Sequence, residues 1–169
     1  MERKPTRKEV IAVIASRKPW LIPLIYTIYS LGGSAKLEEI KEILSLRSIV
    51  LKRGLWWLQK FGIATRKNDK VVMDPEYKKV LDELFMDICK TRNYYILKFG
   101  ATYLVVSVKR TRISSYTVPA QLVEELAKMV NNVSAEFTPK DLAEAMGIPP
   151  KLAYRVVKTR KLLIECSKK

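Results

Sequence analysis

Apolar side chains recur at helical spacing through most of the chain, and this pattern predicts its helices. Residues 7–16 and 19–31 are rich in apolar side chains and predict two helices, and Gly32-Gly33 ends the second one. Further on, apolar residues recur every three or four positions with charged residues between them, as in amphipathic helices. Such helices are predicted over 36–44 with Ser34 as N-cap, 47–60, 75–92, 118–130, 139–146 with a capping box at Thr138 and Asp141, and 149–160.

Short extended segments interrupt these helices. Residues 63–66 and 70–74 flank the polar stretch 67–70, a composition that predicts a hairpin. Residues 94–100 and 102–110 are rich in aromatic and β-branched side chains and meet at a Gly-Ala pair, which predicts a second β-hairpin. A final extended run is predicted over LLIECS, near the C-terminal end.

Two stretches of the chain share one apolar pattern. Each stretch consists of a capped helix, a turn of three or four residues, and a second helix whose outer face is basic. The first copy has Ile40, Leu44, Leu46, Leu51 and Leu55, and the second has Leu142, Met146, Ile148, Ala153 and Val157 at the same spacings. This spacing lets two helices cross over one small core, as in a helix-turn-helix, although short turns between amphipathic helices also produce it by chance.

With these features the sequence resembles the winged-helix family in two tandem copies, 19–74 and 118–169. In the first copy, Leu58, Gly62 and Ile63 stand where the family has Leu, Gly and an apolar residue before its wing, and Arg66 stands where it often has Arg. The second copy has no glycine after its second helix and only one wing strand, so any second wing is incomplete.

The resemblance implies a fold class and a domain organisation. We expect a mainly α protein with small β content (α+β), in which tandem winged-helix domains are joined by a helix and a β-hairpin. The expected parts are a winged-helix domain with an N-terminal arm and a C-terminal helix over 1–92, a β-hairpin linker over 93–117, and a second winged-helix domain over 118–169. The helix 75–92 stands where the family often has a dimerisation helix, so it serves either a homodimer or the packing of the two modules.

Charge narrows the class of partner. The chain carries 32 Lys and Arg against 17 Asp and Glu, a net charge of +15. The excess is spread evenly, +7 over 1–90 and +8 over 91–169, so neither half is an acidic partner domain. A compact protein with this charge is expected to bind a polyanion.

Composition also argues against catalysis. The chain has no histidine, which excludes Ser-His-Asp and Cys-His nucleophile systems and His-ligated metal sites. Phosphate-binding glycine motifs are absent from the sequence. We therefore expect no enzyme activity, no cofactor and no metal. The longest apolar run, 19–31, is too short to span a membrane, so we expect a cytoplasmic, nucleoid-associated protein.

Two cysteines leave one question open. Cys89 and Cys166 lie 77 positions apart, so they form no CxxC pair. They are either buried thiols that pack as small hydrophobic residues or the two halves of a long-range disulfide. Gln and Asn are scarce beside abundant Lys, Arg, Ile and Glu, a composition typical of thermophile and archaeal proteins.

The second helix of each copy supplies the candidate DNA contacts. Winding these helices at 100° per residue buries Leu51, Leu55 and Leu58 in the first copy and Ala153 and Val157 in the second. The outer faces then carry Ile49, Lys52, Arg53, Trp56 and Lys60 in the first copy, and Lys151, Tyr154, Arg155, Lys158 and Lys161 in the second. The two hairpins add Arg66, Lys67 and Lys70, and Lys109, Arg110 and Arg112.

These side chains suit different parts of DNA. Arg53 has the geometry to read guanine, Lys52 and Lys60 suit phosphates, and Tyr154 with Arg155 is the candidate base contact of the second copy. A solvated charged face is the alternative for each lysine. An exposed Trp56 among cations is unusual unless it packs on another part of the chain, a dimer mate or nucleic acid.

The sequence therefore predicts a double-stranded DNA-binding protein, a sequence-specific transcriptional regulator with two recognition helices. One alternative is a chromosome-organising, repeat-binding, replication or repair factor without regulatory specificity. A further alternative is a protein-interaction subunit, because winged helices also serve that role.

Overall fold

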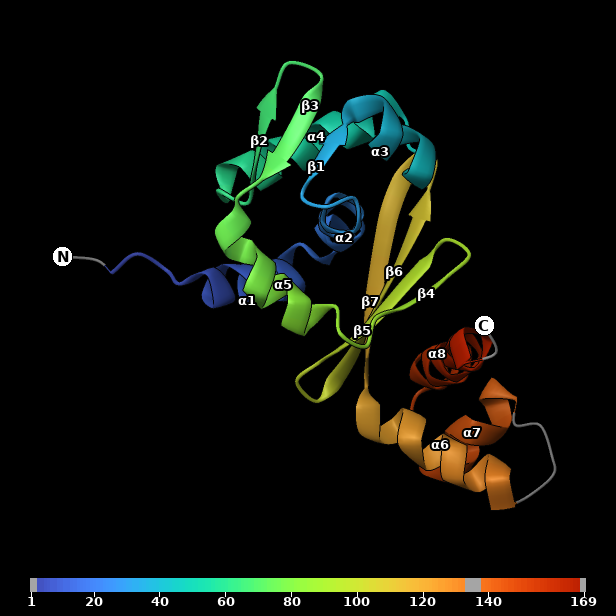
Figure 1. Ribbon diagram of the computed structural model, residues 1–169. Coiled ribbons are helices and arrows are strands. Elements are labelled where there is room, and N and C mark those ends of the chain that lie inside the picture. The colour runs from blue at the N-terminus through green and yellow to red at the C-terminus, as the bar shows by residue number, and fades with distance from the viewer. Residues whose placement is uncertain (1–2, 133–137, 168–169) are drawn as a thin grey trace. The chain divides into compact units, whose positions relative to one another are not determined.

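The computed structural model describes residues 3–132 and 138–167 (Figure 1). Over these residues the chain is a mixture of helices and two small antiparallel sheets, which confirms the expected α+β class. It divides into two compact units. Unit 1 comprises Met1–Asp87 with Val106–Ser115, and unit 2 comprises Ile88–Val105 with Tyr116–Lys169.

The helices of unit 1 follow the predicted apolar segments. They are α1 (Arg7–Arg17), the short 3-10 helix η1 (Pro19–Leu21), α2 (Ile22–Ser30), α3 (Leu37–Leu44) and α4 (Ser48–Lys60). Ile28 of α2, Ile40 of α3 and Leu58 of α4 are fully buried, so these three helices share a core. The Thr6 side chain caps α1 by accepting a hydrogen bond from the Glu9 N–H.

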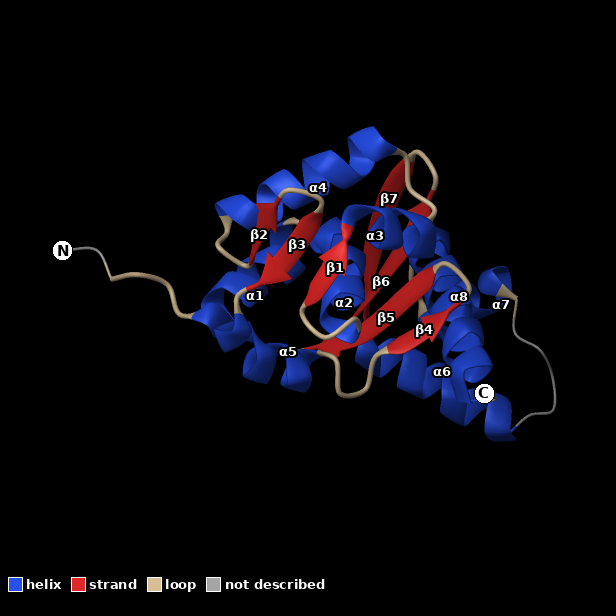
Figure 2. Cartoon of the chain, turned by 45° about the horizontal axis from the view of Figure 1, so that its top comes forward, coloured by secondary structure: helices blue, strands red, loops and turns tan. Residues whose placement is uncertain are grey.

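A three-stranded sheet completes this part of unit 1. Its strands β1 (Ser34–Lys36), β2 (Ala64–Lys67) and β3 (Lys70–Met73) lie in the order β1-β3-β2 (Figure 2). The hairpin predicted around 67–70 is thereby confirmed. The predicted N-cap at Ser34 is wrong, because pairing with β3 holds Ser34 in a strand. Lys36 is the N-cap residue of α3, and its N–H donates to the Glu39 carboxylate.

The single helix predicted over 75–92 is also wrong. The structure has a 3-10 turn η2 (Pro75–Tyr77), a short helix α5 (Lys78–Leu84) and then a strand β4 (Cys89–Thr91). Cys89 pairs with Ile96 and Thr91 with Tyr94 of the next strand, and both Cys89 and Thr91 are buried. Partners on another strand therefore outweigh the local helical pattern at its C-terminal end.

The second sheet extends the predicted hairpin on both sides. Strands β5 (Tyr94–Phe99) and β6 (Thr102–Lys109) form the hairpin, and β7 (Arg112–Pro119), which the sequence did not predict, pairs with β6. The order is β4-β5-β6-β7. The end of the β6–β7 hairpin, Val106–Ser115, belongs to unit 1.

Three helices form the rest of unit 2: α6 (Ala120–Asn132), α7 (Pro139–Met146) and α8 (Pro150–Ser167). The predicted capping box is confirmed, because the Thr138 hydroxyl accepts from the Asp141 N–H at 3.2 Å and the Asp141 carboxylate accepts from the Thr138 N–H at 3.4 Å. Gly147 ends α7 with φ 65°, the left-handed conformation that favours glycine.

The extended run predicted near the C-terminal end is wrong, because α8 continues through Ser167. Three side chains of its last turns are held by the sheet. Leu162 is buried beside Ile96 and Val105. Glu165 accepts from the Thr91 hydroxyl and from Arg92. Cys166 forms a disulfide with Cys89, with 5.8 Å between the Cα atoms, which answers the open question about the two cysteines. Within the described part of unit 2, no wing strand follows α8.

Among the described residues, no individual helix has the length and apolar character needed to cross a bilayer. One pair of segments, Arg7–Arg17 and Pro19–Ser30, has the required length and apolar character when taken together. The chain bends by 108° between these two segments.

Candidate nucleic-acid interface

The orientation of α4 is set by the residues that it buries. Leu51, Leu55 and Leu58 are buried as predicted, and so is Gly54 between them. A Cβ at Gly54 would lie 2.1 Å from Cδ1 of Leu24 on α2. A larger residue at Gly54 would therefore have to displace the buried Leu24 side chain, so this face of α4 packs against α2.

The outward face of α4 is the one that the sequence predicts. Ile49 is 65% exposed and Trp56 is 56% exposed, and Lys52, Arg53 and Lys60 are exposed with them. We refer to these five residues as the α4 face. Two exposed large apolar side chains among three cations are unusual for a surface that contacts only water.

The tryptophan on this face has a partner within unit 1. The rings of Trp56 and Trp57 meet edge to face with their centroids 4.9 Å apart. The Lys60 ammonium lies 4.9 Å from the Trp56 centroid, and the Lys18 ammonium lies 3.8 Å from the Trp57 centroid. The contacts orient the Trp56 ring next to a positive charge and leave the residue exposed.

The β2–β3 hairpin brings together three lysines from three strands. Lys67 of β2 pairs with Lys70 of β3, and Lys70 also pairs with Lys36 of β1. Directly opposed residues on antiparallel strands point to the same face with Cβ atoms about 5 Å apart, so the lysines form a row across the sheet. We call Lys36, Lys67 and Lys70 the lysine row. The neighbouring positions Ala35 and Val71 point to the core and are buried.

Lys36 is a residue that sequence reasoning missed. The sequence predicted Lys36 as the first residue of the helix 36–44, whereas the β1–β3 pairing places it in the row. The predicted Arg66 is exposed at the same hairpin, and its Nε donates to the Asn68 carbonyl at 3.1 Å. Asp69 lies in the same turn, so the hairpin also contains one acidic residue.

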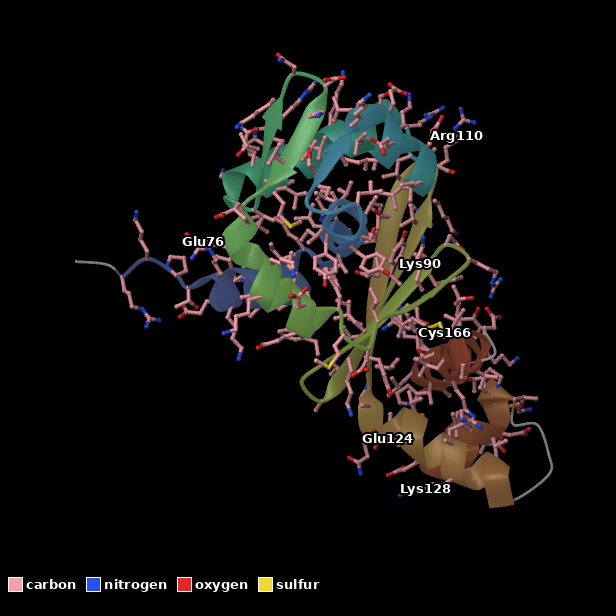
Figure 3. The ribbon with its side chains drawn as sticks, viewed as in Figure 1. Glu76, Lys90, Arg110, Glu124, Lys128 and Cys166 are labelled. Carbon is pink, nitrogen blue, oxygen red and sulfur yellow. A yellow bond between two sulfur atoms is a disulfide. The ribbon has the colours of Figure 1, made fainter. Side chains whose placement is uncertain are left out.

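The tip of the β6–β7 hairpin is hydrogen-bonded to the N-cap residue of α4. The Arg47 N–H donates to the Arg110 carbonyl at 2.9 Å, and Arg47 is the N-cap residue of α4. Lys109, Arg110 and Arg112 are all exposed, and so is Arg47, which the sequence analysis did not select. The tertiary structure thus places the predicted hairpin cations beside the predicted recognition helix (Figure 3).

The second predicted helix face is only partly open. Lys151, Tyr154 and Lys161 of α8 are exposed as predicted, and Tyr154 is 55% exposed. The prediction that Arg155 and Lys158 also face outward is wrong, because both are half-buried.

Rings of the sheet strands cover these two cations. The Arg155 guanidinium lies 5.4 Å from the Tyr116 ring of β7, and the Lys158 ammonium lies 5.0 Å from the Tyr94 ring of β5. A hydrogen bond with Tyr94 raises the pKa of Lys158 above its ordinary value, although partial burial opposes this. Burial raises the pKa of Tyr116 above its ordinary value. These contacts hold α8 to its own sheet.

In the described part of the chain, the cations around α4 form no ion pairs with carboxylates. Ion pairs of unit 1 include Arg3–Glu9, Arg7 with Asp74 and Glu76, and Lys78–Asp82, and ion pairs of unit 2 include Arg92–Glu165 and Lys98–Glu124. Within residues 3–132 and 138–167, no ion pair includes a cation of the α4 face, the lysine row or the β6–β7 tip. These exposed cations are therefore not held in ion pairs among the described residues, and such a surface suits a polyanion.

The chain was compared with models of protein families, with curated proteins and with solved structures, and none of these comparisons finds a match.

Proposed function

We propose that the chain binds duplex DNA through the α4 face and acts as a sequence-specific transcriptional regulator. The observation that carries the proposal is the α4 face itself: three exposed cations with no carboxylate partner among the described residues, next to an accessible tryptophan. Buried leucines and the close contact at Gly54 hold this face in place.

The chemistry of the face fits the two parts of a DNA duplex. An α-helix fits the major groove, where a planar guanidinium such as that of Arg53 reads guanine through two hydrogen bonds. Lys52 and Lys60 are placed to contact phosphates on either side. Ile49 at the start of the helix offers an apolar contact for a thymine methyl group.

The order of elements in unit 1 supports assigning it to the winged-helix fold. Helices α2, α3 and α4 are followed by the β2–β3 hairpin, and β1 before α3 adds the third strand. In this assignment α4 is the recognition helix and the hairpin is the wing, with the lysine row as its phosphate-binding element. The tandem arrangement has weaker support, because the α7–α8 pair of unit 2 is followed by no wing strand within the described residues.

The primary test is fluorescence anisotropy with a labelled 30-base-pair duplex of random sequence at several salt concentrations. A protein that makes six to ten phosphate contacts loses about 10³- to 10⁵-fold in affinity between 50 and 200 mM salt. We expect a dependence of this order, and no binding at 50 mM salt would refute the proposal. Selection from random duplexes then tests regulation, because an enriched motif supports a regulator and an unenriched pool supports an architectural DNA-binding protein.

Exposure of Ile49 and Trp56 supports a second candidate, a protein-interaction module. Aromatic side chains are enriched at protein interfaces, and lysine is depleted there. Replacing Lys52 and Arg53 with alanine separates the two functions. Loss of DNA binding favours the nucleic-acid interface, whereas unchanged DNA binding together with a Trp56-dependent complex favours the protein interface.

A further inference from the structure

The end of the β6–β7 hairpin is built as part of unit 1. Val106 and Val108 are buried at 0% and 6% exposure, while Lys109 on the alternate face is exposed. The Ser107 and Ser114 hydroxyls, one from each strand, lie 2.9 Å apart and hydrogen-bond across the hairpin. The apolar face therefore anchors the hairpin, and its last residues extend beyond the buried part.

The main chain holds this tip at the beginning of α4. The hydrogen bond joins the Arg47 N–H to the Arg110 carbonyl, so it uses no side-chain atom of either residue. Both arginine side chains remain exposed, and Figure 3 shows Arg110 at the end of the hairpin. The position of the tip is thus independent of the charged groups that it carries.

The charges at this place repel one another. Lys109, Arg110 and Arg112 stand within four consecutive residues, and Arg47 adds a fourth cation from the α4 cap. Within the described residues none of the four has an ion-pair partner. Binding of a polyanion at this point would relieve the repulsion between the four cations, and this would favour binding.

We propose that the β6–β7 tip, with Arg47, binds the phosphate backbone of the same duplex that the α4 face contacts. This inference rests on the proposed function and adds a second backbone-binding element to it. The β2–β3 hairpin leaves from the C-terminal end of α4, and the β6–β7 tip is docked at its N-terminal end. A 13-residue helix is about 20 Å long, longer than the major groove is wide at about 12 Å, so groups at its two ends reach the two flanking backbones.

The test uses the full chain with Lys109, Arg110 and Arg112 all changed to alanine. Each lost phosphate contact lowers the slope of log affinity against log salt by about 0.9. We expect two to three lost contacts to make the slope smaller by about 1.8 to 2.7 and, at 0.1 M salt, to lower the affinity by about 60- to 500-fold if the curves converge at 1 M. Hydroxyl-radical footprinting on a selected duplex should show lost protection at one end of the site only.

Two control variants make the result specific. The first control replaces three exposed lysines outside the proposed surface, Lys79, Lys128 and Lys140. It removes the same charge and should change the slope by less than about 1. Changing Arg110 and Arg112 to lysine keeps the charge and should leave the slope and the footprint unchanged. Thermal unfolding of each variant reports whether the fold is intact.

The outcomes separate this inference from the proposed function. If the wild-type chain binds and Arg53→Ala weakens binding, but the alanine variant of the tip keeps the full slope and footprint, the tip does not contact DNA and the proposed function stands. The tip proposal also fails if the control variant loses as much as the tip variant. If the wild-type chain does not bind at 50 mM salt, both proposals fail together.

Discussion

Helices α4 and α8 make different use of similar sequences. Each follows a shorter helix and a tight turn, and in each the apolar spacing predicts a basic outer face. In α4 the predicted cations are all exposed, whereas in α8 two of the four contact tyrosine rings on strands of the same unit. A basic helix face is therefore a binding surface only where no other part of the chain covers it. This difference makes α4 the candidate site and gives α8 a role in holding unit 2 together.

The largest effect is expected from breaking the disulfide that holds α8 to β4. Changing Cys89 and Cys166 to serine removes a link across 77 residues, which by chain entropy stabilises the folded chain by about 4 kcal/mol. Thermal unfolding followed by circular dichroism should show a lower transition temperature, and reduction of the wild-type chain should have the same effect. A double-serine variant that unfolds at the wild-type temperature would contradict the structural role of the link.

The next effect concerns DNA binding by the α4 face. Arg53→Ala should weaken binding to a selected duplex by about 1 to 3 kcal/mol, because one guanidinium that reads a base contributes that much discrimination. The free energy of unfolding should change by less than about 0.5 kcal/mol, since the side chain is exposed and without an ion pair in the described structure. Lys128→Ala serves as the control from an exposed site on α6. Equal losses in the two variants would mean that only total charge matters.

Replacing cations with alanine on α8 should mainly lower the stability of the folded chain. Arg155→Ala with Lys158→Ala removes contacts with Tyr116 and Tyr94, each expected to stabilise unit 2 by about 0.5 to 1 kcal/mol. Chemical unfolding should show this loss, while affinity for the selected duplex changes less than in Arg53→Ala. If the α8 variant instead loses more affinity than the α4 variant and keeps its stability, the two helices have the opposite roles.

The smallest effect is expected from pH. The chain has no histidine, the thiols are joined, and the pKa shifts move away from neutrality: Lys158 is raised above 10.5 and Asp82 is lowered below 3.8. The contribution of Lys158 to the stability of the folded chain is present below about pH 10 and is lost as the pH rises through the raised pKa of Lys158. That of Asp82, which accepts from Tyr29 and Lys78, is present above about pH 4 and is lost as pH falls through its lowered pKa. DNA affinity measured from pH 5.5 to 8 should therefore stay nearly flat, and a tenfold change would reveal another titrating group.

Much of the candidate site followed from local pattern. The exposed positions of α4 were predictable because helical spacing places Ile49 and Trp56 opposite the buried leucines, whatever the rest of the fold does. The row that includes Lys36 was not predictable, because it depends on which strand pairs with β3 and in which register. The packing of Gly54 against Leu24 of α2 was not predictable either, because a glycine inside a helix does not indicate which residue it will contact.

The order of residues along the chain was enough to predict the amphipathic helices, their buried faces, the Thr138 cap, the two hairpin turns and the excess of positive charge. These depend on residues within a few positions of one another, where spacing and side-chain chemistry decide the outcome. Three contacts depend on the complete fold: Cys89 bonds to Cys166, rings cover Arg155 and Lys158, and Arg110 lies beside Arg47. Each of these joins segments at least 39 positions apart, because strand pairing and core packing select partners that no local pattern specifies.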